Sequence, residues 1–278
     1  MSFRDILVHL KSYEAWSPHI DVAADLASRF NAHLTGLFND ADLAILKHIA
    51  AGPGGNADYF ALREAQAAAN VAAAKAKFTA EMTRRGVAHS FEHAEGRANE
   101  ILALVGRFHD LIVTEQSQTT HDEFNWTDAE DAAIRSGRPS LVVPHTGHSG
   151  ALGNNIVIAW NGSREACRAL SAAMPFVETA QKVTVLVGEF REAAPSATRM
   201  PSLDIATYLG RHAKALHIQS IAGKDRAAGE EILSAVKAAG ADLLVMGAFG
   251  RHGFAQMIFG SATGYVLRRL TVPALMAN

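Results

Sequence analysis

The sequence predicts an α/β protein made of two tandem copies of one open, parallel-sheet unit. Two observations support this fold class: short apolar runs alternate with amphipathic helical stretches, and several sequence patterns occur twice in the same order. Near-continuous apolar strands separated by helices are typical of a parallel sheet covered on both faces. The 278 residues are enough for one large domain or two small ones.

The repeated patterns indicate a unit of about 130–145 residues. Four matches occur in the same order: 5–8 with 155–158, 100–102 with 231–233, 110–111 with 242–243, and 138–143 with 271–276. We therefore predict a first domain over 1–146 and a second over 151–278. The connection Pro144–Gly150 is rich in turn-forming residues and lacks apolar periodicity. The offset between the two members of each matching pair is larger for the first pair than for the later ones. This difference predicts insertions early in the first copy.

The second copy shows the order of elements most clearly. Its predicted strands share short apolar runs and cover 156–160, 183–187, 217–221, 243–246 and 272–276. The first connecting helix is expected to be capped by Ser163 and to place Ala166, Leu170, Met174 and Val177 on one face. Further helices are predicted at 203–216, 229–239 and 261–270, the second of these ending at Gly240.

The first copy contains a long insertion. An alanine-rich helix is predicted from Asn56 to Arg85, ending at Gly86. The connection 38–56 before it contains Gly52-Pro53-Gly54-Gly55. It is interpreted either as a surface loop or as a cover over a cleft.

Composition excludes several classes of protein. Apolar residues make up 49% and charged residues 19% of the chain, which argues against disorder. The net charge of −2 and the pI of about 6.7 argue against a nucleic-acid partner. The single cysteine, Cys167, excludes an internal disulfide. No signal peptide and no apolar stretch of membrane-spanning length is visible, so a cytoplasmic protein is expected.

The most informative motif follows the predicted strand 243–246. It has the form Gly-x2-Gly-x9-Gly-Ser, with Gly247, Gly250, Gly260 and Ser261 at the fixed positions. In open α/β sheets the carboxyl end of a central strand is where ligands bind, and glycines let a ligand approach the backbone. Gly260-Ser261 would open the last helix, whose free N–H groups can bind phosphate. On spacing alone, tight turns remain the alternative interpretation.

Two cationic residues follow the second glycine of this motif. Arg251 and His252 either add positive charge for phosphate or are solvated loop residues. The segment lacks the spacing of a Rossmann fingerprint, and no P-loop pattern occurs elsewhere in the chain.

The motif, followed by a helix and a Val-Pro-Ala-Leu strand, resembles the universal stress protein family in its tandem form. The resemblance implies a five-stranded parallel sheet in each copy, in the adenine-nucleotide alpha hydrolase-like fold. It implies that Gly247, Gly250, Gly260 and Ser261 contact the ribose and phosphates of an adenine nucleotide, and we expect ATP with Mg²⁺ as this ligand. It also places at the nucleotide the neighbouring residues Ala159, Trp160, Asn161, Val187, Arg251, His252 and Ala262.

The chain departs from this pattern in two places. Family members carry an acidic residue where this chain has Asn161, which makes metal-assisted hydrolysis less favoured. The first copy has no glycine between Gly106 and Gly137, and Glu115 follows its corresponding strand. We therefore expect the first copy to have lost triphosphate binding, and to be structural or to bind another ligand.

The function expected from these features is ATP binding by the second copy in a regulatory or stress-protective protein. No catalytic residue and no protein metal ligand is predicted, so hydrolysis is expected to be slow at most. The alternatives are a slow ATPase or nucleotidyl-transfer enzyme, and a scaffold that binds no nucleotide. The sequence is compatible with a protein partner and with a homo-oligomer.

Overall fold

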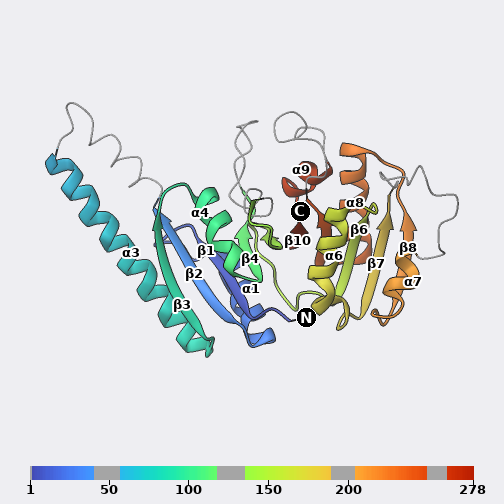
Figure 1. Ribbon diagram of the computed structural model, residues 1–278, viewed down its shortest axis with the longest axis horizontal. Coiled ribbons are helices and arrows are strands. Elements are labelled where there is room, and N and C mark those ends of the chain that lie inside the picture. The colour runs from blue at the N-terminus through green and yellow to red at the C-terminus, as the bar shows by residue number, and fades with distance from the viewer. Residues whose placement is uncertain (1, 41–56, 118–134, 189–203, 249–261) are drawn as a thin grey trace. The chain divides into compact units, whose positions relative to one another are not determined.

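The computed structural model describes residues 2–40, 57–117, 135–188, 204–248 and 262–278 (Figure 1). Contacts divide the chain into two compact units, formed mainly by residues 2–117 and by residues 139–278. Each unit is an open, mostly parallel α/β sheet, which confirms the predicted fold class. The predicted domain limits, 1–146 and 151–278, remain a prediction. Of the connection predicted over 38–56, residues 38–40 belong to a strand that ends at Asp40, and residues 41–56 lie outside the described residues.

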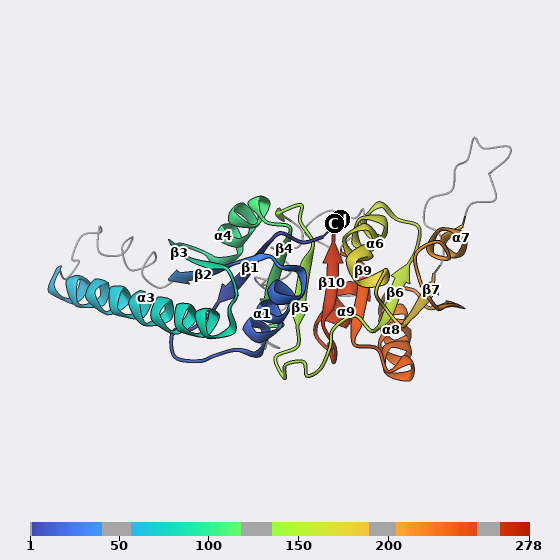
Figure 2. The same cartoon turned by 90° about the horizontal axis from the view of Figure 1, so that it is seen from below.

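The N-terminal unit contains four parallel strands in the order β3-β2-β1-β4. The strands are β1 (Asp5–Leu10), β2 (His33–Asp40), β3 (His89–Glu95) and β4 (Leu111–Glu115). The helices are α1 (Pro18–Phe30), α3 (Ala57–Arg85) and α4 (Ala98–Val105), followed by the short 3₁₀ turn Gly106–Phe108. Helices α1 and α3 cover one face of the sheet and α4 covers the other (Figure 2).

The C-terminal unit contains five parallel strands in the order β10-β9-β6-β7-β8. They are β6 (Asn155–Trp160), β7 (Lys182–Val187), β8 (Leu216–Ser220), β9 (Leu243–Gly247) and β10 (Ala274–Ala277). The helices are α6 (Arg164–Val177), α7 (Ile205–Leu209), α8 (Asp225–Ala239) and α9 (Ala262–Leu267). A sixth strand, β5 (Ser140–Val143), pairs antiparallel with β10, a pairing that the sequence did not predict.

The predicted repeat appears as identical strand registers in the two units. Ile6 pairs with Leu111 in one unit, and Ile156 pairs with Leu243 in the other. In the same way, Leu10 pairs with Phe38, and Trp160 pairs with Val187. Each position at the carboxyl ends of these strands therefore has a defined counterpart in the other unit.

An aspartate fixes the start of the first strand in each unit. The carboxylate of Asp110 accepts hydrogen bonds from the N–H groups of Arg4 and Asp5, at 2.7 and 3.1 Å. The carboxylate of Asp242 accepts three, from residues 153, 154 and 155, at 2.7, 2.9 and 3.1 Å. The N–H group of each aspartate also donates to the carbonyl of the residue that opens the strand. The Asp-Leu pattern found twice in the sequence thus marks a repeated structural contact.

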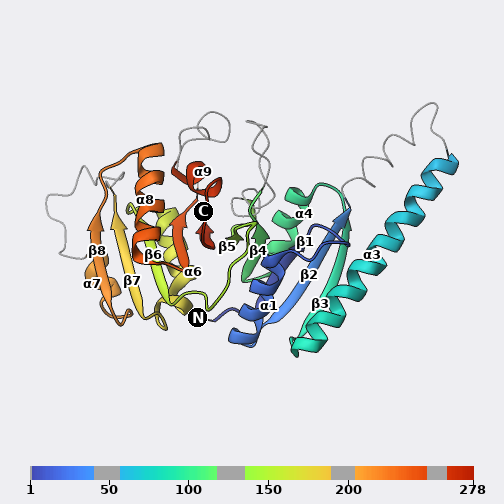
Figure 3. The same cartoon turned by 180° about the vertical axis from the view of Figure 1, so that it is seen from behind.

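Helix α3 accounts for much of the insertion predicted in the first copy. It has 29 residues, whereas α7, at the corresponding place in the C-terminal unit, has five. Figure 3 shows α3 running along β3. A narrow stripe of Ala67, Ala74, Phe78 and Met82 is buried. A Cβ on Gly36 of β2 would lie 2.8 Å from the Phe78 ring, so this helix packs closely only because the strand residue is glycine.

Several predicted helix ends are confirmed, and other limits differ: α8 begins before the predicted residue 229, and α9 ends before the predicted residue 270. Ser163 accepts a hydrogen bond from the Ala166 N–H at 3.2 Å, and Gly240 ends α8 with a φ of 56°. The helix predicted over 203–216 is too long: α7 ends at Leu209, with Gly210 as its C-cap residue. Within the described part of the chain, none of the helices combines the length and the apolar composition that crossing a bilayer requires.

A buried histidine lies in the N-terminal unit where α1 meets the end of β1. His19 is fully buried, and its Nε2–H donates to the carbonyl oxygen of His9 at 2.6 Å. Burial lowers the pKa of His19 to about 3, because a charged imidazolium would lose its hydration there. The side chain is therefore neutral at physiological pH.

The aspartate contacts predict unequal losses of stability. Asp242→Ala removes three partly buried hydrogen bonds to a charged acceptor and should lower the free energy of unfolding by about 2–3 kcal/mol. Asp110→Ala removes two exposed ones and should cost about 1 kcal/mol. Urea unfolding of the full chain, followed by circular dichroism, measures both. Equal losses, or a larger loss for Asp110→Ala, would contradict the assigned role.

The pKa of His19 predicts an acid-sensitive N-terminal unit. Because its pKa is lower in the folded state than the usual 6.5, the unfolded state takes up the proton first. The stability contributed by this group is complete above pH 6.5 and falls as the pH drops towards about 3, at about 1.4 kcal/mol per pH unit. His19→Gln keeps a side-chain N–H donor but cannot be protonated in this range, so its unfolding free energy should fall less between about pH 6 and about pH 4. An unchanged pH dependence in the variant would refute this explanation.

Candidate functional site

The strand order of the C-terminal unit points to one edge of its sheet as the place where a ligand would bind. Strand β6 lies between β9 and β7, so the chain order reverses there. Helices α6 and α7 lie on one face and α8 and α9 on the other (Figure 2). In open α/β sheets, ligands bind outside the carboxyl ends of the strands at such a reversal. The edge formed by the ends of β6, β7 and β9 is therefore the candidate site.

The structure brings several of the predicted site residues to this edge. Trp160 and Val187 are paired at the ends of β6 and β7, and Ala159 pairs with Met246, the residue before Gly247. Ala262 opens α9. The predicted contacts Gly250, Arg251, His252, Gly260 and Ser261 lie outside the described residues. The ligand contacts assigned to all of these residues remain predictions.

Gly247 lets the first turn of α6 lie directly on the end of β9. A Cβ at this position would lie 2.6 Å from the Ala166 nitrogen and 2.8 Å from the carbonyl carbon of Glu165. Any side chain would displace this helix, so packing alone requires a glycine. The contact fixes the turn between β6 and α6 against the candidate site.

Asn161 shapes that turn with its side chain. Its Oδ1 accepts a hydrogen bond from the Ser163 N–H at 3.1 Å, and Gly162 between them has a φ of 71°. The amide oxygen is therefore already engaged within the protein. On the strand before it, the buried indole N–H of Trp160 has no hydrogen-bond acceptor in the described part of the protein.

Glu165 is a residue at this edge that the sequence analysis did not identify. It lies in the first turn of α6 and is only 9% exposed. Its Cβ is 3.0 Å from the point that a Cβ on Gly247 would occupy. Acidic residues are common in the first turn of a helix because the helix dipole stabilises a negative charge there. The sequence alone therefore does not distinguish Glu165 from an ordinary surface residue.

The corresponding edge of the N-terminal unit is occupied by polar side chains. The counterparts of Ala159 and Gly188 are His9 and Asn39. The Asn39 amide donates to the Gly96 carbonyl at 3.0 Å, which leaves its Oδ1 to accept from His9 Nε2 at 2.8 Å. These side chains thus bond to one another and to the backbone, where the other unit has a methyl group and a hydrogen atom.

An ion pair at the same edge is a second difference between the two units. Lys11 and Glu115 stand at the positions of Asn161 and Gly247, and their charged groups are 3.5 Å apart. Glu115 also brings a negative charge to the place where the C-terminal unit has no side chain. This arrangement is consistent with the prediction that the first copy does not bind triphosphate.

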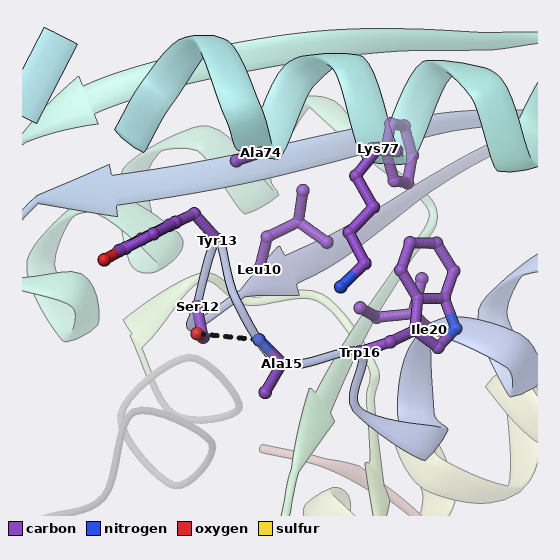
Figure 4. A pocket seen from close by; sticks show the side chains of 9 residues that line it. Leu10, Ser12, Tyr13, Ala15, Trp16, Ile20, Ala74 and Lys77 are labelled. Carbon is purple, nitrogen blue, oxygen red and sulfur yellow. Dashed lines mark hydrogen bonds between the residues drawn. The ribbon is translucent and has the colours of Figure 1, made fainter. Parts of the chain in front are cut away.

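A shallow pocket in the N-terminal unit lies between the β1–α1 connection and α3 (Figure 4). It is lined by Leu10, Ser12, Tyr13, Ala15, Trp16, Ile20, Ala74, Lys77 and Phe78. Its polar groups are largely satisfied by the protein: Lys77 donates to the Glu14 carbonyl at 2.7 Å, and the Trp16 indole donates to Asp21 at 3.1 Å. We assign it no ligand. Across the described ranges, no group of three or more His, Cys, Asp or Glu side chains is arranged to hold a metal ion.

Comparison with known proteins agrees with the fold and with the repeat. The model of the universal stress protein family matches residues 154–278. A universal stress protein from Archaeoglobus fulgidus DSM 4304 superposes with a TM-score of 0.74 and 16% identity, over 99% of this chain and 96% of that one. A functionally unknown protein from Pseudomonas aeruginosa PAO1 superposes with a TM-score of 0.62 and 17% identity, over 99% and 92%. No curated protein sequence matches the chain.

The family model and the solved structures support different conclusions about the chain. The family model covers the unit that carries the complete glycine motif, whereas the solved structures cover nearly the whole chain and show its fold. Residues 154–278 therefore match the universal stress protein family, and the chain as a whole shares the fold of these solved structures.

Proposed function

We propose that the C-terminal unit binds an adenine nucleotide, with ATP as the expected ligand, at the carboxyl edge of β6, β7 and β9. The chain would act as a nucleotide-responsive regulatory or stress-protective protein. The observation that supports this most directly is the contrast between the two units at corresponding positions of this edge. In the N-terminal unit this edge is filled by hydrogen-bonded side chains of the protein, and in the C-terminal unit it carries small residues.

The small residues leave room for a ligand beside the backbone. Gly188 follows β7 directly, and a Cβ there would have its nearest neighbours at 3.8 Å, an ordinary contact distance. Ala159 presents only a methyl group. The flat ring of a purine needs such space next to strand ends, with backbone groups available for hydrogen bonds. In the N-terminal unit, His9 and Asn39 would occupy the same space.

The sequence motif supports the same location for the phosphates. Gly247 ends β9 at this edge, and Gly250, Gly260 and Ser261 follow before α9. We propose that backbone N–H groups of this segment contact ribose and phosphates, and that Arg251 and His252 add positive charge. The bound nucleotide would influence a partner protein only if its affinity differs between conformations of the chain.

The contrast between the units predicts the effect of Gly188→Asn. This change places at the C-terminal edge the residue that the N-terminal unit has there, and it should reduce ATP affinity at least tenfold by filling the proposed purine space. The fold should tolerate the change because a Cβ at Gly188 meets no close neighbour. Isothermal titration with ATP measures the affinity, and thermal unfolding checks the fold.

Gly240→Asn is the matched control. Gly240 has a left-handed backbone at the end of α8, where asparagine is the best-tolerated substitute, and it lies at the opposite end of β9 from the site. The control should bind ATP as the wild type does. Unchanged ATP affinity in a folded Gly188→Asn variant, or two ATP molecules bound per chain, would refute the proposed location.

A further inference from the structure

Helix α3 carries a second apolar stripe on the side that faces away from its sheet. We call it the outer stripe; its members lie at alternating steps of three and four positions and are Leu62, Ala65, Ala69, Ala72 and Ala76. All of them are exposed, Leu62 by 68%, and Tyr59 shortly before them is 54% exposed. Apolar residues that recur about every 3.5 positions are the pattern with which two helices pack along a common seam.

The N-terminal part of α3 receives little packing from its own unit. None of the side chains from 58 to 66 is buried, and Figure 2 shows these turns extending beyond β3. Alanine favours an exposed helix by itself, but Leu62 and Tyr59 leave large apolar surfaces in water. Helices in proteins gain most of their stability from the packing of an apolar face, so a second helix on the outer stripe would stabilise this segment.

The charges on the exposed part of α3 indicate which helix fits the outer stripe. Glu64 lies in its N-terminal part, and Lys75 follows eleven positions later. They are about 16 Å apart along the axis, too far to pair with each other on one helix. In two parallel copies of α3 like charges would face each other, whereas in two antiparallel copies each glutamate meets a lysine. A two-fold axis between identical chains can produce this antiparallel arrangement.

One antiparallel register satisfies the stripe and the charges together. It places Ala69 of one copy opposite Ala72 of the other, and Ala65 opposite Ala76. The methyl groups let the helix axes approach to about 8 Å, the close end of the usual range. In this register Glu64 lies on the same side of the seam as Lys75 of the second copy, displaced by about 3 Å along the axis. Symmetry repeats the ion pair, so two identical pairs flank the seam.

We propose that the outer stripe is a homodimer contact in which α3 packs antiparallel against α3 of a second copy of this chain. The contact uses the side of α3 opposite the buried Ala67 and Ala74, so each copy keeps its own core. It gives a role to the helix that most distinguishes the N-terminal unit, since the corresponding α7 has only five residues. The inference does not depend on nucleotide binding.

Sedimentation equilibrium of the full chain, in a concentration series, tests this contact with Ala69→Arg. The wild type should dimerise, and the variant should raise the dissociation constant at least tenfold, because a long charged side chain at the centre of the seam holds the helices apart. Ala238→Arg is the matched control, since it adds the same side chain at an exposed alanine of α8. The control should dimerise as the wild type does, and thermal unfolding checks the fold of both variants.

A charge exchange tests the antiparallel arrangement. Glu64→Lys and Lys75→Glu should each raise the dissociation constant by about fivefold, because symmetry removes two exposed ion pairs at once. The double variant should return to the value of the wild type, since the same pairs form again with their signs reversed. In a parallel contact neither single variant should matter, because like charges would face each other in every case.

Three results would overturn the inference. A wild type that stays monomeric throughout the concentration series would leave the outer stripe without a second copy. Equal effects of Ala69→Arg and Ala238→Arg would place any dimer contact elsewhere on the chain. Single charge variants without effect, or a double variant that fails to restore the dimer, would contradict the antiparallel packing of α3.

Discussion

Parallel pairing brings the carboxyl ends of the strands to one edge of each sheet, and the two units carry different side chains at that edge. At the amino ends the units agree: Asp110 and Asp242 hold the first strand through the same backbone contacts. At the carboxyl ends they differ, because His9 and Asn39 form a hydrogen-bonded pair where Ala159 and Gly188 have no polar side chain. The two units thus share the contacts that set strand register, whereas their residues differ at the edge where we propose that a ligand binds.

The contact between Gly247 and α6 links fold and function in the C-terminal unit. Because no side chain intervenes, the first turn of α6 reaches the end of β9 and places Glu165 at the candidate site. The same glycine belongs to the sequence motif that predicts phosphate binding. Its position is required by packing whether or not a ligand binds, so a glycine in such a motif is by itself incomplete evidence for a nucleotide.

The sequence predicts the strands, the duplication and the helix ends at Ser163 and Gly240, because apolar periodicity and capping are local properties. The helix predicted over 203–216 was too long, because α7 ends at Leu209. The antiparallel pairing of β5 with β10, the hydrogen bond of His9 with Asn39 and the burial of Glu165 depend on residues far apart in the chain. Sequence spacing carries no direct signal for these. The ligand contacts predicted for Gly250, Gly260 and Ser261 await experiment.

The central claim is that adenine nucleotide binds to one unit of this chain and not to the other. Photolabelling of the full chain with an azido-adenine analogue of ATP, followed by peptide mass spectrometry, tests it most directly. We expect labelled peptides within residues 155–278, with labelling suppressed by excess unmodified ATP. Specific labelling confined to residues 2–117, or labelling that ATP does not suppress, would contradict the account.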